Sequence, residues 1–185
     1  MLGGPMGTLP TTLNHEFSRV PQAEIQRSTF NRVHGLKTTF NSGDLIPIYM
    51  DEVLPGDTFQ MNATGFGRLA TPIYPIMDNL YLETFFFYVP NRIIWDNWER
   101  FNGAQDDPDS STDFLVPQIT NTTVAEGSLF DYFGLPTQVA GLNWNNLHGR
   151  AYNLIWNEWF RDENLQDSLE VPKNDGPDDY THYSV

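Results

Sequence analysis

The sequence contains no cysteine, which excludes disulfide bonds, zinc–thiolate sites and cysteine nucleophiles. It also lacks a long hydrophobic run: the most apolar stretch, residues 80–89, is about half the roughly 20 residues that a membrane-spanning helix needs. The amino terminus, MLGGPMGTLP, has neither the basic start nor the apolar core of a signal peptide. We therefore expect a protein that is made and used in a reducing, soluble compartment.

Basic residues are scarce. Ten Lys and Arg face 24 Asp and Glu, so the net charge is −14. Residues 1–40 hold four basic and two acidic residues, so the rest of the chain carries −16. A body this acidic repels phosphate backbones, which argues against a broad nucleic-acid-binding face.

Motifs for catalysis or cofactor binding are also missing. The sequence has no HxH or HExxH pattern, no phosphate loop, no GxGxxG and no nucleophile elbow. Glu158 and Asp162 lie four residues apart without a nearby His or Lys, so we interpret them as solvated carboxylates and not as an acid/base pair. We expect that the protein is not an enzyme and binds no cofactor. The weaker, enzymatic alternative is a glycosidase that uses two carboxylates.

An acidic loop at residues 104–113 carries a partial metal motif. Asp107, Asp109 and Asp113 alternate as oxygen ligands do at the start of a calcium loop. The sixth position is Thr112, where an EF-hand needs Gly, and the twelfth is Gln118, where it needs Glu. We interpret the segment as a solvated surface loop and its three aspartates as a weak calcium candidate.

Aromatic residues dominate the segment around which the chain is organised, TPIYPIMDNLYLETFFFYVPNR (residues 71–92). Its second half, residues 80–89, is apolar at consecutive positions, which predicts a central strand covered on both faces. The remaining predicted strands are shorter. They are an edge strand at 44–54, interrupted by Pro47, an alternating strand at 58–69 beyond a Pro55–Gly56 turn, a short strand at 114–119, and the opening of another in YTHYSV at 180–185.

Two helices are predicted, near residues 92–102 and at 147–164. The first has Asn91 as its N-cap, places Trp95 and Trp98 on one face and is terminated by Gly103. The second has apolar side chains every four residues and an opposite polar stripe, formed by Arg150, Asn153, Asn157 and Arg161. A short helical turn is expected at 129–133, stopped by Gly134.

The composition favours two parts. Residues 1–40 show no clear period and predict an extended arm, and residues 41–185 predict a mainly β domain with helical insertions. The competing function is a carbohydrate-binding β-sandwich that would use Trp95, Trp98 or Trp144 as a stacking ring and the acidic loop as a calcium site. Such a protein needs at least one of those rings on its surface beside polar groups.

Four long blocks of the sequence closely resemble the major capsid proteins of microviruses, in particular the gokushovirus branch of small single-stranded DNA bacteriophages. The blocks are residues 27–59 (RSTFNRVHGLKTTFNSGDLIPIYMDEVLPGDTF), 68–103 (RLATPIYPIMDNLYLETFFFYVPNRIIWDNWERFNG), 131–137 (DYFGLPT) and 150–168 (RAYNLIWNEWFRDENLQDS). The resemblance implies an eight-stranded antiparallel jelly roll with long loops, of which residues 41–185 are the first part, truncated at the carboxyl end.

The resemblance also implies a function and partners. The chain would be a structural protein of the virion, made in the bacterial host cytoplasm and assembled with other copies into a small icosahedral shell around circular single-stranded DNA. The family uses a separate small basic protein to neutralise the genome, in keeping with the acidic body found here. The arm of mixed polarity fits a segment tucked under neighbouring subunits on the inner surface of such a shell, which makes the following residues candidates for facing DNA: Arg19, Arg27, Arg32 and Lys37.

Overall fold

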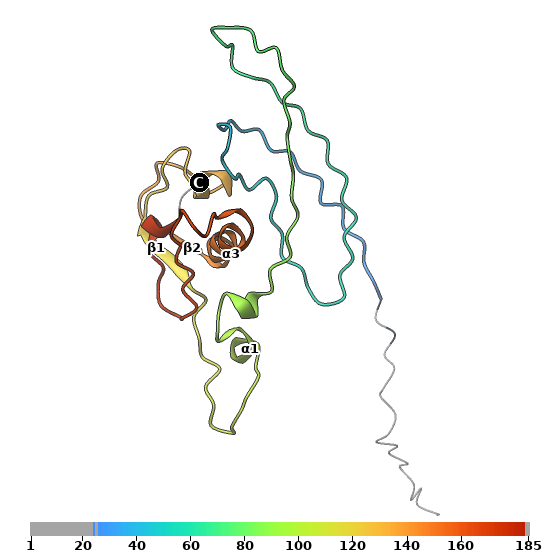
Figure 1. Ribbon diagram of the computed structural model, residues 1–185. Coiled ribbons are helices and arrows are strands. Elements are labelled where there is room, and N and C mark those ends of the chain that lie inside the picture. Colours follow the sequence, from blue (N-terminus) through green and yellow to red (C-terminus); the bar gives the residue numbers. More distant parts are fainter. Residues whose placement is uncertain (1–23, 25, 184–185) are drawn as a thin grey trace, which may run out of the picture. The chain divides into compact units, whose positions relative to one another are not determined.

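The computed structural model describes residue 24 and residues 26–183. The chain divides into two units, Met1–Gly35 and Leu36–Val185. The described residues of the first unit form no helix or strand and are exposed. The predicted boundary at residue 40 stays a prediction. The second unit contains these elements, of which α1, β1, β2 and α3 are labelled in Figure 1: η1 (Asn91–Ile93), α1 (Trp98–Phe101), β1 (Gln118–Thr122), α2 (Leu129–Tyr132), β2 (Leu142–Asn145), α3 (Leu147–Ile155), the π-helical turn η2 (Trp156–Phe160) and η3 (Tyr180–His182).

The sheet in the described part of the chain consists of β1 and β2, which pair in antiparallel fashion. Gln118 lies opposite Asn145 and Ile119 opposite Trp144, and the register shifts before Thr122. Asn121 causes the irregularity: its φ of 51° bends β1, and its backbone N–H donates to Asn143 Oδ1 instead of to a backbone carbonyl. Only one face of β1 is covered, because Ile119 is buried while its neighbours are exposed.

The connection between β1 and β2 contains the short helix α2. Ser128 caps it, since its Oγ accepts from the backbone N–H of Asp131 while an oxygen of Asp131 accepts from the N–H of Gly127. Gly134, at φ 89°, ends the turn by donating to the carbonyl of Asp131. The expected helical turn is therefore confirmed at Leu129–Tyr132.

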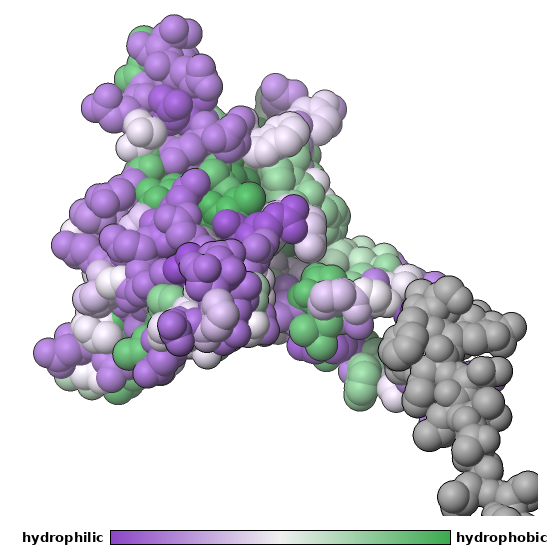
Figure 2. Space-filling model, turned by 90° about the horizontal axis from the view of Figure 1, so that it is seen from below, coloured by the Kyte–Doolittle hydropathy of each residue, from purple (hydrophilic) through white to green (hydrophobic). Residues whose placement is uncertain are grey.

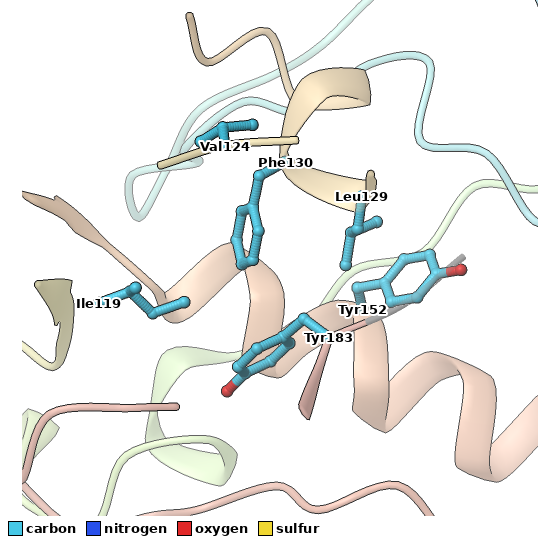
Figure 3. Close-up of a cluster of buried hydrophobic side chains, with 6 residues drawn as sticks. All are labelled: Ile119, Val124, Leu129, Phe130, Tyr152 and Tyr183. Atoms are coloured by element: carbon cyan, nitrogen blue, oxygen red, sulfur yellow. The ribbon is translucent and has the colours of Figure 1, made fainter. Parts of the chain in front are cut away.

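One hydrophobic cluster lies between α2, the sheet and α3 (Figure 3). Phe130 is at its centre, and its ring lies 5.0 Å from Trp144 and 5.6 Å from Tyr183 between centroids. Burial of a large aromatic side chain stabilises a fold by about 1.5–3 kcal/mol, so this cluster accounts for much of the stability of the unit. Its buried members are Ile119, Val124, Leu129, Phe130, Tyr152 and Tyr183.

A second cluster is built on Ile94, Trp95 and Leu147. The predicted helix near 92–102 is interrupted here: η1 and α1 are separate, and the N-cap of η1 is Pro90 and not Asn91. The break occurs because the N–H of Asp96 donates to the carbonyl of Lys173, outside any helix. The predicted end at Gly103 is confirmed by its φ of 96°.

The second predicted helix is confirmed in position but ends early. α3 continues into η2, where Arg161 N donates to the Trp156 carbonyl, and the backbone of Arg161 is then extended. The helix therefore stops at residue 160 and not at 164. This turn sends residues 169–183 back along α3. Among the described residues, no helix could span a lipid bilayer.

The expected strands before residue 114 do not form ladders in this structure. Residues 26–90 contain no helix or strand, and every residue from 52 to 88 is exposed, so the expected buried central strand at 80–89 is wrong for this chain by itself. A strand needs partners for its N–H and C=O groups, and no described segment supplies a ladder here. The Pro55–Gly56 turn is confirmed, since Asp57 N donates to the Leu54 carbonyl and Gly56 has φ 86°.

Two smaller expectations also differ from the structure. The strand expected at 114–119 is shifted, since β1 begins at Gln118. The strand expected at residues 180–185 is a 3₁₀ turn over its described part, capped by Asp179, whose side chain accepts from the N–H of Thr181. The jelly roll that the family resemblance implies is thus represented here by one two-stranded sheet.

Candidate assembly surface

An exposed apolar ribbon, residues 73–88, is the most unusual surface feature of the second unit. Met77 is 98% exposed and Ile73 is 93% exposed. Figure 2 shows hydrophobic residues at the surface among polar ones. Contiguous exposed apolar surface on this scale marks sites where proteins bind other proteins. The large side chains that the ribbon exposes are Ile73, Tyr74, Ile76, Met77, Leu80, Tyr81, Leu82, Phe85, Phe86, Phe87 and Tyr88.

The end of the ribbon and the π-helical turn η2 form an aromatic platform of four rings, Phe85, Phe87, Trp159 and Phe160. The Phe160 ring lies 5.4 Å from that of Phe85 and 6.0 Å from that of Phe87, both edge to face. Trp159 lies 5.8 Å from Phe87 and remains 72% exposed. Such edge-to-face packing fixes the rings relative to one another, so the platform is an ordered apolar surface.

Carboxylates are close to the platform along the chain. Glu158 immediately precedes Trp159, and Asp162 and Glu163 follow the turn. Glu83 precedes Phe85 by two residues. All four acidic residues are exposed, so the two segments that supply the platform's rings are acidic at the surface.

The predicted polar stripe of α3 does not face water. It binds a strap, which we define as residues 169–183. Asn157 and Leu169 exchange two hydrogen bonds of 2.8 Å, and Asn153 Nδ2 donates to the carbonyls of Glu170 and His182. These amides satisfy backbone groups that the strap would otherwise leave unpaired. They thus fix both ends of the strap to the helix.

The centre of the strap is held by a buried ion pair. Arg150 and Asp178 have side chains that are 0% and 1% exposed, with Nη2 and Oδ1 2.7 Å apart. Asp178 also accepts from Arg150 Nε, from Asn146 Nδ2 and from the Tyr183 hydroxyl. A second N–H of Arg150 donates to the Ile94 carbonyl, which ties the strap to the second hydrophobic cluster. This geometry satisfies both charges in a site without solvent.

Burial also affects two tyrosines around the strap. Desolvation, with a smaller contribution from the charge of Asp44, raises the pKa of Tyr152 to about 12. Desolvation and the adjacent Asp178 carboxylate raise the pKa of Tyr183 further. Both phenols are therefore neutral and act as donors, Tyr152 to the Leu45 carbonyl and Tyr183 to Asp178. The Tyr152 bond holds residue 45 of the irregular region against the core.

The candidate DNA-facing residues are only partly described. Arg19 lies outside the described residues. Arg27, Arg32 and Lys37 are exposed on an irregular segment together with Phe30 and Val33. Their contact with DNA stays a prediction.

The calcium candidates are not brought into a metal site. Asp107, Asp109 and Asp113 are exposed, and no described group of three or more His, Cys, Asp or Glu side chains could hold a metal ion. The neighbouring Asp106 pairs with Arg100 at 2.8 Å. Glu158 and Asp162 are exposed, as expected for solvated carboxylates.

Of the tryptophans proposed as sugar-stacking rings, Trp95 is buried, and Trp98 and Trp144 are half-buried. Trp95 is 0% exposed and donates its indole N–H to Asp175. Trp98 packs on Trp95 and Phe101, and Trp144 packs on Phe130. Trp95 is closed to a ligand, and Trp98 and Trp144 are half-buried with their rings packed on other aromatic rings, which weighs against the carbohydrate-binding alternative. The exposed ring is Trp159, which the sequence argument placed on the buried face of a helix.

Comparison with known proteins identifies the family. A profile of the capsid protein (F protein) family matches residues 18–185. The capsid protein VP1 of Bdellovibrio phage phiMH2K is 53% identical over 173 residues, which are 92% of this chain and 32% of that protein. The VP1 of Chlamydia phage 1 is 52% identical over 171 residues, 88% of this chain and 29% of that protein.

A more distant relative agrees. The VP1 of Spiroplasma virus 4 is 39% identical over 154 residues, 82% of this chain and 28% of that protein. The chain thus spans about a third of the length of the relatives that it matches. The family match covers most of the chain, including the apolar ribbon, the platform and the strap. The chain therefore belongs to the capsid protein (F protein) family.

Proposed function

We propose that this chain is part of a capsid subunit of a small single-stranded DNA bacteriophage, and that its role in the virion is structural. The observation that carries the proposal is the family match over residues 18–185, together with an apolar ribbon whose large side chains are exposed. An isolated soluble domain buries such a surface, whereas a subunit of a shell covers it in the assembly.

The same proposal accounts for the missing strands. Gly65 of the segment 58–69 lies next to Leu82 of the segment 80–89, since a Cβ at Gly65 would be 3.9 Å from the Leu82 side chain, but no ladder joins the two segments. We propose that in the complete capsid these segments become strands of a jelly roll when further strands pair with them. The high content of aromatic and β-branched residues at 80–89 supports such a position.

The proposed partners follow from charge and surface. Other copies of the capsid protein would cover the ribbon. The packaged single-stranded DNA would be neutralised chiefly by a separate small basic protein, because the chain beyond residue 40 carries a charge of −16.

Sedimentation velocity of the chain and two variants tests the proposal. We expect the chain to form oligomers whose mass grows with concentration, and Ile73→Lys to weaken this association because it places a charge in the ribbon. Leu165→Lys is the matched control, since Leu165 is 83% exposed outside the ribbon. Equal association of both variants would contradict a role of the ribbon, and a monomer at every concentration would contradict the proposed function.

A further inference from the structure

The carboxyl end of the ribbon is not paired in a ladder, but its side chains alternate as those of a strand do. Phe85 and Phe87 contact the rings of η2, and Val89 packs against the second hydrophobic cluster. Between them, Phe86 and Tyr88 are 65% and 75% exposed, compared with 55% for Phe85 and 37% for Phe87. Successive side chains of a strand point to opposite faces, so one face of this segment already lies on the folded part of the unit.

The π-helical turn η2 presents two consecutive rings to this segment. A π turn closes with a hydrogen bond between residues five apart, here from the N–H of Arg161 to the Trp156 carbonyl. Such a turn holds more residues than an α turn, so neighbouring side chains are separated by a smaller angle. Trp159 and Phe160 therefore both reach the ring of Phe87, at centroid distances of 5.8 and 6.0 Å.

Contacts outside the ribbon hold η2 in place. Asn157, inside the turn, exchanges two hydrogen bonds with Leu169 of the strap. Directly after the turn, Arg161 Nη1 donates to the Gln166 carbonyl at 3.0 Å. The rings of η2 are thus positioned by bonds to which residues 80–89 do not contribute. A surface that is ordered in advance binds a segment at a lower entropic cost.

The facing of residues 80–89 needs such a guide, because both faces of this stretch are apolar. A slip by one residue moves every side chain of a strand to the opposite face. A polar face would keep a strand from slipping, but here Phe85 and Phe87 alternate with Phe86 and Tyr88. The hydrophobic pattern therefore leaves the facing open, and ring contacts of defined geometry can decide it.

We propose that Trp159 and Phe160 are positioning residues that fix which face of the strand at residues 80–89 lies on the helix. They hold Phe85 and Phe87 against η2, and the opposite side chains then face the second sheet of the complete capsid domain. In this arrangement α3 and η2 form the helical layer that covers one face of a sheet. The place in a jelly roll rests on the proposed function, whereas the facing is a property of this chain.

Hydroxyl-radical footprinting with mass spectrometry tests the facing on the unaltered chain, because it reports the oxidation of each ring separately. The chain is kept at the lowest practical concentration, so that neighbouring copies do not cover the ribbon. The oxidation rate of each ring is divided by its rate in the urea-denatured chain, which removes the intrinsic difference between Phe and Tyr. We expect this ratio to be about half as large for Phe87 as for Tyr88, in proportion to their exposed fractions of 37% and 75%.

A variant of η2 tests the cause of the facing. Phe160→Ala should raise the ratios of Phe85 and Phe87 to that of Phe86 and leave the ratio of Phe86 unchanged. The matched control is Leu165→Ala, which should leave all three ratios unchanged, since Leu165 is 83% exposed outside η2.

Two further observations keep the test valid if Phe160→Ala disturbs the fold. The ratio of Phe130, which is 2% exposed, stays low as long as the core is folded. Trp159→Ser removes a ring that is 72% exposed, so it costs no buried side chain and should also raise the ratio of Phe87.

The outcomes separate this inference from the proposed function. Equal ratios for the four rings, or lower ratios for Phe86 and Tyr88 than for Phe85 and Phe87, would overturn the facing. Ratios of Phe85 and Phe87 that change in neither variant would overturn the role of η2. Each of these results would leave the capsid assignment standing in a chain that forms oligomers. A chain that is monomeric at every concentration but shows the expected alternation would contradict the proposed function and leave the facing intact.

Discussion

Loss of the carboxylate charge at Asp178 should be the most destabilising conservative change in the second unit. The Asp178→Asn variant keeps the size of the side chain but leaves the Arg150 guanidinium, which is fully buried, without a counter-charge. Breaking a buried ion pair by removing one partner costs about 3–5 kcal/mol. Asp178 also accepts hydrogen bonds from Asn146 and Tyr183. The Asn side chain of the variant keeps only one acceptor oxygen, so it cannot accept all of these hydrogen bonds and the cost of the lost charge is not offset.

Urea denaturation followed by tryptophan fluorescence measures the effect. Trp95 is a useful reporter, since it is buried and its indole N–H donates to Asp175 next to the strap. With a urea m value of about 2 kcal/mol/M, the expected midpoint shift is about 1.5–2.5 M. The control is Asp179→Asn, an adjacent exposed residue that caps η3, for which a loss of about 1 kcal/mol or less is expected.

Two outcomes would refute the reasoning. If Asp178→Asn costs no more than Asp179→Asn, the ion pair does not hold the strap. The double variant Arg150→Met/Asp178→Leu removes both charges, and replacement of a buried pair by apolar residues is often close to neutral. The double variant should therefore be more stable than Asp178→Asn. A lower stability would show that the hydrogen bonds of this pair, and not its charges, stabilise the strap.

Three further changes test the helices and the core in the same denaturation assay. Gly149→Ala should destabilise the chain by about 1–3 kcal/mol although Ala favours helices, because the new Cβ would collide with the side chain of Asn146; a more stable variant would contradict this close packing. Ser128→Ala should cost about 1 kcal/mol through loss of the α2 cap, and an unchanged midpoint would show that the cap is dispensable. Burial raises the pKa of Tyr152 from 10.0 to about 12, so the phenol ionises at lower pH in the unfolded chain than in the folded chain. The contribution of Tyr152 to the free energy of unfolding is therefore fully present below pH 10 and is lost as the pH rises from about 10 to 12. Tyr152→Phe should flatten the decline of the midpoint in this range, and an unchanged decline would contradict the assignment.

Local features of the fold were predictable from sequence where one physical rule decides them. Gly134 ends α2 and Gly56 completes its turn because each has a positive φ that glycine adopts at no steric cost. The position of α3 followed from the four-residue apolar repeat, although its end did not. That end depends on Asn157 and its bonds to Leu169, a contact between residues 12 apart that no helical period reveals.

The polar stripe of α3 shows why the strap was missed. Arg150, Asn153 and Asn157 have the spacing of a solvated face, and the same spacing suits a face that binds backbone carbonyls. The sequence cannot distinguish water from peptide as the partner. The two Asn residues on the stripe were a signal, because amides bind backbone groups through both a donor and an acceptor.

The strand β2 was also missed. Its sequence LNWN alternates between apolar and polar residues, but four residues are too few for the alternation to be recognised as a strand.

The second half of the apolar ribbon was predicted to be part of a buried strand at residues 80–89, but its side chains are exposed. The hydrophobic pattern at residues 80–89 reports that these side chains are covered in the functional protein, but it does not report by which chain. The described residues supply one two-stranded sheet, and the large side chains of this stretch remain 37–84% exposed. The discrepancy is therefore what we expect of a part of a subunit whose remaining contacts come from further chain or from neighbouring copies.

The central claim is that this chain carries assembly contacts of a capsid subunit. Sedimentation velocity over a range of concentrations, with electron microscopy of the same samples, tests it most directly. The account predicts discrete oligomers of the 21.2 kDa chain that grow with concentration and are lost on mutation of the ribbon. A single monomeric species at every concentration, with one sharp cooperative unfolding transition, would contradict it.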